Sequence, residues 1–324
     1  MRREGERLVV VEDPEPLTQP LWGRLLSMVT WHQPVMVQEV LHYLNPNPGA
    51  IIIDGTVGTG GHSLMVLPHL LPDGRLLAID HDQESLLLAR KRLAEFEPQV
   101  TCLHGNFRHI PILLRKLGIS RVDGLLLDLG MSSVQVDRPE RGFSFSKEGP
   151  LDMRMDSEQD ATAATLLNTL TADELTVVLE TLGEERFARR IAHCIVQARR
   201  VCPIATTTQL ARLVIQAIPS HERHGRLHAA TRTFQALRLA VNDELGALRD
   251  LLQQLPTLLN PGARAVILTF HSLEDRLVKQ AFLQGMRDQR WTILTKKPVR
   301  PSRDEVVKNV RARSAKLRAL ECYR

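Results

Sequence analysis

The chain has 324 residues, of which 43% are hydrophobic and 24% charged, so it is long enough for one large domain or for one domain with an insertion. No apolar run approaches the roughly 18 residues of a membrane span, and the mixed-charge start before residue 8 leads us to expect no secretory signal. The four cysteines lack C-x-x-C spacing, which argues against a zinc site or a disulfide framework and is typical of reduced thiols in a cytosolic protein.

The net charge of +5 is concentrated near the carboxyl end of the chain. Residues 290–318 contain ten Lys or Arg and two acids, whereas the rest of the chain contains 32 basic and 35 acidic residues. Local positive charge is expected of a surface that meets phosphates. A solubilising tail is the alternative.

Residues 51–128 follow a regular alternation of strands and helices. Residues 1–30 hold three prolines among polar residues and are predicted to form a loose extension. The pattern then predicts strands at 51–54, 75–80, 99–104 and 122–128, with helices near 60–71, 83–95 and 107–117. Near-continuous apolar strands that alternate with helices indicate a parallel sheet with helices on both faces.

This alternation stops after residue 128. Residues from about 137 to 240 contain no comparable strand, and helical patterns occur at 161–170, 172–181, 185–198 and 208–217. The sheet then resumes, with helices predicted at 243–258 and 272–284, a turn at 260–262, and strands at 263–270, 291–295 and 315–321. We therefore predict a sheet domain made of 31–136 and 241–324, interrupted by a helical domain at 137–240 that binds the substrate.

The first predicted strand ends in a glycine-rich loop. Three isoleucines precede Asp54, and Gly58 and Gly60 follow it. The second strand ends at Asp80. A strand, a glycine turn, a helix and a second strand with a terminal acid are typical of a nucleoside-binding half-sheet, in which the acid reaches the ribose hydroxyls. We expect an adenosine-containing ligand here.

The residues of this loop favour one adenosine cofactor over another. The dinucleotide fingerprint G-x-G-x-x-G is matched imperfectly, because Ser63 occupies the third glycine place. Asp54 would repel a pyrophosphate, but its carboxylate suits the amino end of a methionine moiety. The pattern thus favours S-adenosylmethionine over a dinucleotide. The alternative for Asp54 is a purely structural turn or helix cap.

Polar or aromatic groups follow the later strands as well. Phe107 follows the third strand and could lie against an adenine face. Asp128 to Gln135 follow the fourth strand, and Thr269 to Ser272 follow the fifth. Ligands of open α/β sheets bind at these strand ends. Any one of these residues alone is more often part of the core or a cap than a ligand.

Eight motifs along the chain resemble the bacterial RsmH (MraW) family. They are Asp54–Thr56 with Gly60–Ser63, Leu127–Gly130 with Ser132 and Ser133, Arg141–Phe145, Gly149–Asp156, Gly183–Ala188, Ala230–Ala236, Thr269–Arg276 and Arg311–Arg318. The resemblance covers about 32–318. Val134 and Val310 replace expected prolines, and Met131 replaces a smaller apolar residue.

The resemblance implies an S-adenosylmethionine-dependent methyltransferase that acts on N4 of a cytidine in the decoding region of 16S ribosomal RNA. It also implies an α/β fold, a Rossmann-like class I methyltransferase sheet with an inserted all-helical domain. By position, the family's cofactor contacts fall on Gly60, Gly61, His62, Asp80, Phe107, Asp128 and Gln135.

Methyl transfer to a cytosine amine needs alignment and a proton acceptor. The amine lone pair is delocalised into the ring, so a group that takes a proton would localise it. Asp128 is our candidate for this catalytic role, and backbone carbonyls of the following loop could share it. Alternatively, Asp128 only contacts the cofactor.

A cytosine must leave its stack to react, so we also expect groups that grip RNA. The predicted RNA-binding residues are Arg141, Arg186, Arg189, Arg232 and Arg238. The aromatic neighbours of Arg141 could equally anchor the helical domain. No histidine spacing supports a metal site, and none is predicted.

We expect the chain to act in the cytoplasm on 16S rRNA, within the small ribosomal subunit or its precursor, as a monomer or homodimer and away from membranes. Two other functions stay open. One is an amine methyltransferase with a different nucleic acid, against which the absence of an N-P-P-Y-type tetrapeptide argues. The other is a ribosome-assembly factor that binds RNA and cofactor without chemistry.

Overall fold

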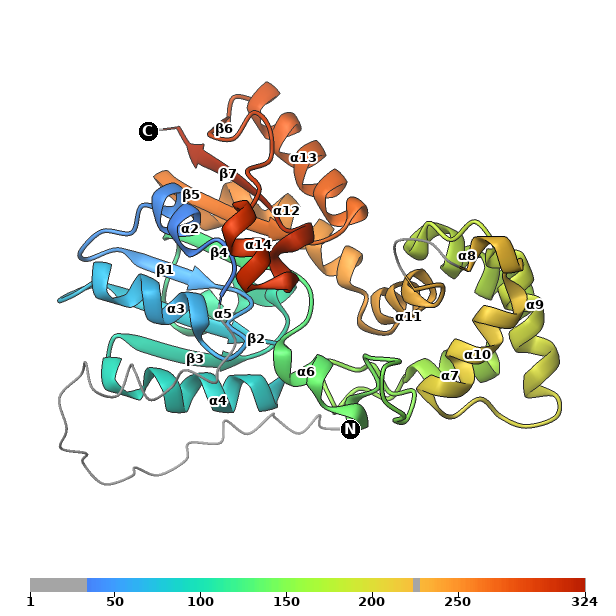
Figure 1. Ribbon diagram of the computed structural model, residues 1–324. Helices are drawn as coiled ribbons and strands as arrows, with labels where there is room; N and C mark the ends of the chain where they lie inside the picture. The colour runs from blue at the N-terminus through green and yellow to red at the C-terminus, as the bar shows by residue number, and fades with distance from the viewer. Residues whose placement is uncertain (1–33, 224–227, 324) are drawn as a thin grey trace, which may run out of the picture. The chain divides into compact units, whose positions relative to one another are not determined.

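The computed structural model describes residues 34–223 and 228–323, and the predicted extension at 1–30 lies outside them. Its centre is a seven-stranded sheet in the order β3-β2-β1-β4-β5-β7-β6 (Figure 1). The strands are β1 (Ile51–Asp54), β2 (Arg75–Asp80), β3 (Val100–His104), β4 (Val122–Asp128), β5 (Leu259–Thr269), β6 (Trp291–Ile293) and β7 (Lys316–Cys322). This order confirms the predicted Rossmann-like class I methyltransferase sheet.

Strands β1 to β5 are parallel, and β7 pairs antiparallel with both β5 and β6. In the centre, Ile53 lies opposite Leu77 of β2 and Leu125 of β4. The chain runs outward in one direction through β2 and β3 and in the other through β4 and β5. Ligands of such sheets bind at this switch point, at the carboxyl ends of the strands.

Both faces of the sheet are buried, which explains the continuous apolar strands. Ile53, Leu127 and Ile267 belong to one core, which is completed by α5 (Ile110–Lys116), α12 (Glu244–Leu258) and α13 (Ser272–Arg287). Residues one position away belong to the other core, which is completed by α2 (Val37–Leu44), α3 (Gly61–Val66) and α4 (Gln83–Leu93). Alternate side chains of a strand point to opposite faces, so each strand contributes to both cores.

A third core lies among the helices that follow β4. They are α7 (Ala163–Thr169), α8 (Ala172–Gly183), α9 (Ala188–Arg199), α10 (Thr207–Ala217) and α11 (Thr231–Asn242). Their buried residues form a cluster with Phe143, Leu151 and Met153 of the preceding loop. Capping boxes begin α8 at Thr171 and α10 at Thr206. The domain boundaries at 137 and 240 stay a prediction.

Several elements differ from the sequence expectation. The structure adds α2, α6 (Ser133–Asp137), α11 and α14 (Arg303–Lys308). Strand β5 begins at Leu259 rather than at 263, and the predicted turn at 260–262 lies inside it. The pairing with β4 shifts there, and Gly262 has a φ of 79°. The turn is therefore a bulge that does not end the strand.

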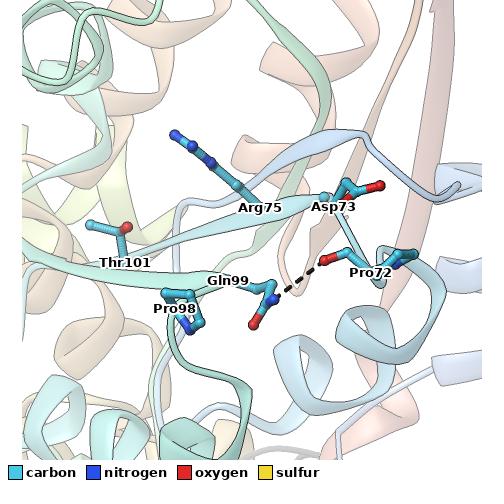
Figure 2. Close-up of a pocket in the computed structure, with 7 residues that line it drawn as sticks. Pro72, Asp73, Arg75, Pro98, Gln99 and Thr101 are labelled. Carbon is cyan, nitrogen blue, oxygen red and sulfur yellow. Dashed lines mark hydrogen bonds between the residues drawn. The ribbon is translucent and has the colours of Figure 1, made fainter.

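A surface hollow of about 250 Å³ opens at the opposite edge of the sheet from the predicted site (Figure 2). Arg75 begins β2 there, and Gln99 Nε2 donates to Pro72 O at 3.3 Å. It lies at the amino ends of β2 and β3, away from the carboxylates at their other ends. Within 34–223 and 228–323, no helix is long and apolar enough to cross a membrane.

Candidate active site

The glycine loop after β1 lies tightly against the strand ends. Gly55 N donates to Leu126 O at 2.9 Å, and a Cβ on Gly55 would lie 2.6 Å from Leu127 Cδ2, so any larger residue would force the Leu127 side chain to move. Gly58 and Gly60 have φ values of 54° and 83°, a region that favours glycine. The loop therefore allows the close backbone approach that a nucleoside ligand needs.

Asp54 is buried where β1 meets this loop. One carboxylate oxygen accepts from Ser63 Oγ at 2.7 Å, and the other accepts from Thr56 N at 3.2 Å. Burial raises the pKa of Asp54, although the hydrogen bond from Ser63 and the nearby His62 oppose the rise. Asp54 thus has the turn role considered above, and it also places a carboxylate in a water-poor part of the site.

Asp80 ends β2 and receives two backbone hydrogen bonds. Its Oδ2 accepts from Gly58 N at 2.6 Å, and its Oδ1 accepts from Asp82 N at 2.8 Å. Burial nevertheless raises the pKa of Asp80 to about 7, and the carboxylates of Asp82 and Asp54 add to the rise. The predicted ribose contact is therefore joined directly to the glycine loop.

Asp82 links the cofactor half of the sheet to the chain beyond β4. Its Oδ1 accepts from Glu84 N at the start of α4, at 3.0 Å. Its Oδ2 accepts from Gln135 Nε2 at 2.8 Å and lies 2.9 Å from Arg141 Nη2. The other end of the Gln135 amide accepts from Ser132 N at 2.9 Å. Gln135 therefore acts on the site through Asp82.

Asp128 ends β4 beside His62. Its backbone N donates to Thr56 Oγ1 at 2.6 Å, which fixes the end of the strand. His62 Nδ1 lies 3.5 Å from Asp128 Oδ2, and Asp128 Oδ1 is buried without a hydrogen-bond partner. Burial raises the pKa of Asp128 to about 7, and the nearby Glu274 adds to the rise. An unpartnered buried carboxylate oxygen is the main feature that the fold leaves for a ligand.

Two buried residues at the end of β5 border this position. His271 begins α13 as its cap, and Glu274 accepts from Phe270 N at 2.8 Å. Glu274 Oε1 lies 3.0 Å from His271 Nε2. Although burial opposes it, the hydrogen bond and charge of His271 hold the pKa of Glu274 below its usual value. The carboxylate of Glu274 adds a negative charge near Asp128.

The remaining predicted cofactor contacts lie at the same edge. Gly60 and Gly61 begin α3. Phe107 follows β3 and is half-buried, and its Cβ is 3.4 Å from the position of a Cβ on Gly55. The structure thus brings the loop, His62, Asp80, Phe107 and Asp128 together, as the strand ends predicted.

Two of the predicted RNA-binding residues have other partners. Arg141 is 16% exposed and pairs with Asp82 and Glu84. Arg238 is 9% exposed and pairs with Glu244 at 2.7 and 3.0 Å. Both guanidinium groups are enclosed by carboxylates, so we withdraw these two as phosphate contacts. Sequence counts charges along the chain but does not reveal which of them the fold buries.

The other three predicted arginines lie on the surface of the helical part. Arg189 is exposed on α9. Arg186 is 66% exposed and pairs with Glu222 at 2.7 Å, and Arg232 donates to Glu184 O at 3.1 Å. These three stay predicted RNA contacts.

Sequence reasoning missed Asp82 and Glu274 as parts of the site. Both carry a signal that could have been used, because Asp82 directly precedes a helix and Glu274 is the third residue after the cap His271. Both then combine a capping role with a buried contact from a distant segment. Among the described residues, no group of three His, Cys, Asp or Glu side chains could hold a metal ion.

The MraW methylase family matches residues 29–323. The chain belongs to this family. Its members among curated proteins include ribosomal RNA small subunit methyltransferase H of Geobacter sulfurreducens, 48% identical over 305 residues that cover 90% of this chain and 98% of that protein. The protein of the same name from Thermotoga neapolitana is 49% identical over 294 residues, covering 90% and 96%.

Solved structures are less similar to this chain. TrmN from Thermus thermophilus has a TM-score of 0.43 and 16% identity, covering 89% of this chain and 48% of that chain. A putative methyltransferase from Streptococcus mutans in complex with SAH has a TM-score of 0.42 and 11% identity, covering 90% and 99%. Family membership confirms the predicted family and the predicted methyltransferase, and its cofactor is S-adenosylmethionine.

The site fits this cofactor. S-adenosylmethionine carries a sulfonium and an ammonium group, and the site offers carboxylates at the ends of β1, β2 and β4, of which Asp54 is buried and Asp80 and Asp128 are half-buried. One of them, Asp128, has an oxygen without a partner. The loop at Gly58 and Gly60 has no side chains at these two positions, so its backbone can approach the cofactor closely. Such a set of anionic acceptors around a bare loop suits a cationic nucleoside better than a pyrophosphate.

Proposed function

We propose that this chain methylates ribosomal RNA of the small subunit, at N4 of a cytidine in the decoding region of 16S rRNA. The curated relatives, at 44–49% identity, carry the name of a small-subunit rRNA methyltransferase. The choice of a cytidine amine as the target comes from the family resemblance. The structural observation that carries the proposal is Asp128, a carboxylate at the switch point with a buried, unpartnered oxygen.

Asp128 is the proton acceptor for the target amine. Bound S-adenosylmethionine supplies an electrophilic methyl group. An amine hydrogen directed at Asp128 draws the nitrogen lone pair out of conjugation with the ring, which makes the nitrogen a nucleophile. A carboxyl with a pKa of about 7 suits this task, because it is partly ionised and still basic near neutral pH. Thr56 and β4 hold its backbone in place.

The other site residues bind and orient. Asp80 accepts hydrogen bonds from the ribose hydroxyls, and Phe107 covers the adenine. Gly60 and Gly61 let the protein backbone approach the cofactor closely. Asp54 holds the amino end of the methionine moiety. Gln135 contributes by fixing Asp82 rather than through a free amide, since both ends of its side chain are engaged.

The helical part at 137–240 binds the RNA. Arg186, Arg189 and Arg232 are exposed on it and contact phosphates, which position the target strand without reading its sequence. The substrate is 16S rRNA in the small ribosomal subunit or its precursor, in the cytoplasm, and the chain acts as a monomer or homodimer.

The test uses small ribosomal subunits from a strain that lacks the modification. The full-length protein is incubated with subunits and methyl-labelled S-adenosylmethionine, and the rRNA is digested to nucleosides. We expect label only in N4-methylcytidine. Label at carbon 5 or in another base, label in DNA alone, or RNA binding without transfer would each contradict the proposal.

Asp128→Asn tests the proton acceptor. We expect kcat to fall by about 10²-fold or more, because the amide accepts no proton. The variant should fold. A carboxyl whose folded-state pKa is raised loses its stabilising contribution as pH rises through about 7, so at pH 8 the variant should be more stable than the wild type by up to about 4 kcal/mol. Urea unfolding at pH 8 measures this. Unchanged kcat in a folded variant would reject the role.

A further inference from the structure

His62 contacts the proposed proton acceptor from α3. Its ring is 6% exposed, with Nε2 at 2.8 Å from Val35 O and Nδ1 at 3.5 Å from Asp128 Oδ2. A backbone carbonyl only accepts hydrogen bonds, so Nε2 must carry a hydrogen. In a neutral imidazole the other nitrogen is then an unprotonated acceptor. His62 therefore presents a lone pair to Asp128.

A lone pair and a carboxylate repel each other at this distance unless a hydrogen lies between them. The contact is buried, and the second oxygen of Asp128 has no partner that could compensate. We propose that His62 and Asp128 share one proton, and that His62, by taking this proton, leaves Asp128 as the carboxylate that receives the proton of the target amine. His62 is thus a positioning residue that acts through Asp128.

This proton transfer rests on the proposed role of Asp128. The shared proton passes from Asp128 Oδ2 to His62 Nδ1. The amine nitrogen then forms its bond to the methyl carbon while the carbon–sulfur bond breaks and its electron pair stays on sulfur. One amine proton passes to Asp128. The pair then holds two protons, of which one leaves to solvent with the product.

Charged groups on three elements face this pair. Asp54 of β1 and Glu305 of α14 lie near His62 and favour its protonated form. Glu274 of α13 lies near Asp128 and disfavours its ionised form. Burial lowers the pKa of His62 and raises that of Asp128 to about 7. In the free protein the proton therefore rests on Asp128, and the two acids beside His62 favour its transfer.

Nitrogen NMR of the wild-type protein, labelled in histidine and free of cofactor, tests the shared proton directly. We expect His62 as the Nε2–H tautomer, with an Nδ1 signal between those of protonated and free nitrogen and a pH midpoint of about 7. In Asp128→Asn the Nδ1 signal should be that of free nitrogen and should not titrate near pH 7. An Nδ1–H tautomer, or the same titration in both proteins, would overturn the proposal.

Kinetics of His62→Gln test the consequence. The glutamine amide keeps a donor for Val35 O but has no base for Asp128. We expect the acid limb of the kcat profile to move up by about one pH unit, with kcat recovering at high pH. His42→Gln, exposed on α2, is the matched control and should leave the profile in place.

The two outcomes of this variant separate a positioning role from a structural one. A loss of kcat that is the same at every pH, together with a raised KM for the cofactor, would mean that His62 only shapes the pocket, and the proposal would fail. Because the NMR result needs neither RNA nor catalysis, it stands or falls separately from the proposed substrate.

Discussion

At the scale of single residues, the site concentrates acids that are difficult to ionise. Asp80 and Asp128 both have pKa values raised to about 7 by burial, and burial also raises that of Asp54. A cationic ligand lowers these raised pKa values, because it favours the ionised form of each carboxyl. Cofactor binding must therefore release protons when it occurs below pH 7.

We predict that affinity for S-adenosylmethionine rises with pH and levels off above about 7. Below that pH the carboxyls are protonated, and each must lose its proton before the cation can bind. The gain is up to about tenfold per pH unit for each proton released. Isothermal titration calorimetry between pH 5.5 and 8.5, in buffers of different ionisation enthalpy, measures both the affinity and the proton count.

S-adenosylhomocysteine is the matched control ligand, because it lacks the sulfonium charge. Its affinity should depend less steeply on pH. Equal pH dependence for the two ligands, or none for either, would show that the carboxylates do not sense the sulfonium.

The sequence predicted which acids end the strands, but it did not predict their partners. Asp54, Asp80 and Asp128 follow from apolar runs with a terminal carboxylate, a local pattern. The contacts of Asp82 with Gln135 and Arg141 join residues more than 50 positions apart. Such pairings depend on how the strands and loops pack, so Arg141 and Arg238 were predicted as RNA contacts although the fold buries both.

At the scale of elements, Arg141 joins the start of α4 to the loop that leads into the helical part. Its guanidinium pairs with Asp82 and Glu84 of the sheet domain, and its Nη2 donates to Arg154 O and Met155 O at 3.1 Å. The loop also contributes Met153 to the helical core. One side chain thus connects the cofactor half-sheet to the segment that precedes α7.

We predict that Arg141→Gln lowers the free energy of unfolding by about 2–4 kcal/mol, because Asp82, only 3% exposed, would keep a buried charge without its cation. Urea unfolding at pH 7.5 measures this, and limited proteolysis within 142–156 should become faster. Arg138→Gln is the control. Arg138 pairs with the same Glu84 but is 47% exposed, and its loss should cost less than about 1 kcal/mol. Equal losses of stability in the two variants would contradict the proposed role of Arg141 in joining α4 to this loop.

The sequence predicted an element well where its apolar pattern was clear, and poorly where residues of the element were assigned to RNA binding instead. The buried strands β1, β2 and β4 begin and end where the sequence placed them. Helix α11 was missed, because two of its residues, Arg232 and Arg238, were interpreted as RNA contacts. In the structure Phe234, Leu237 and Val241 of α11 lie in the helical core. Burial on most sides removed the polar face that marks a surface helix.

At the scale of the whole molecule, the basic carboxyl-terminal run is not a tail. Lys316 and Arg318 lie in β7 and pair with Asp275 at 3.0 and 2.7 Å. Glu305 of α14 accepts from Met36 N at 2.6 Å. The sequence located this charge correctly but did not show that part of it joins β7 to helix α13.

We predict that RNA binding depends on salt and that Arg189→Gln reduces this dependence. Each phosphate contact contributes about 0.7–0.9 to the slope of log affinity against log salt, so the variant should lower the slope by roughly one. The slope is measured from the affinity for small subunits at salt concentrations between about 50 and 300 mM. Over this range several phosphate contacts together should lower the affinity by about 10³-fold or more. Arg75→Gln, in the hollow of Figure 2, is exposed at the far edge of the sheet and should change nothing.

A slope that Arg189→Gln leaves unchanged, or that Arg75→Gln lowers equally, would place the RNA on another surface.

The most direct test of the account is a crystal structure of the protein with S-adenosylhomocysteine and cytidine. We predict the thioether between the glycine loop and Asp128, the ribose at Asp80, and the exocyclic amine of cytidine within hydrogen-bond distance of Asp128. A nucleoside bound with its amine directed away from Asp128, or a cofactor bound anywhere but at the carboxyl edge of β1, β2 and β4, would contradict it.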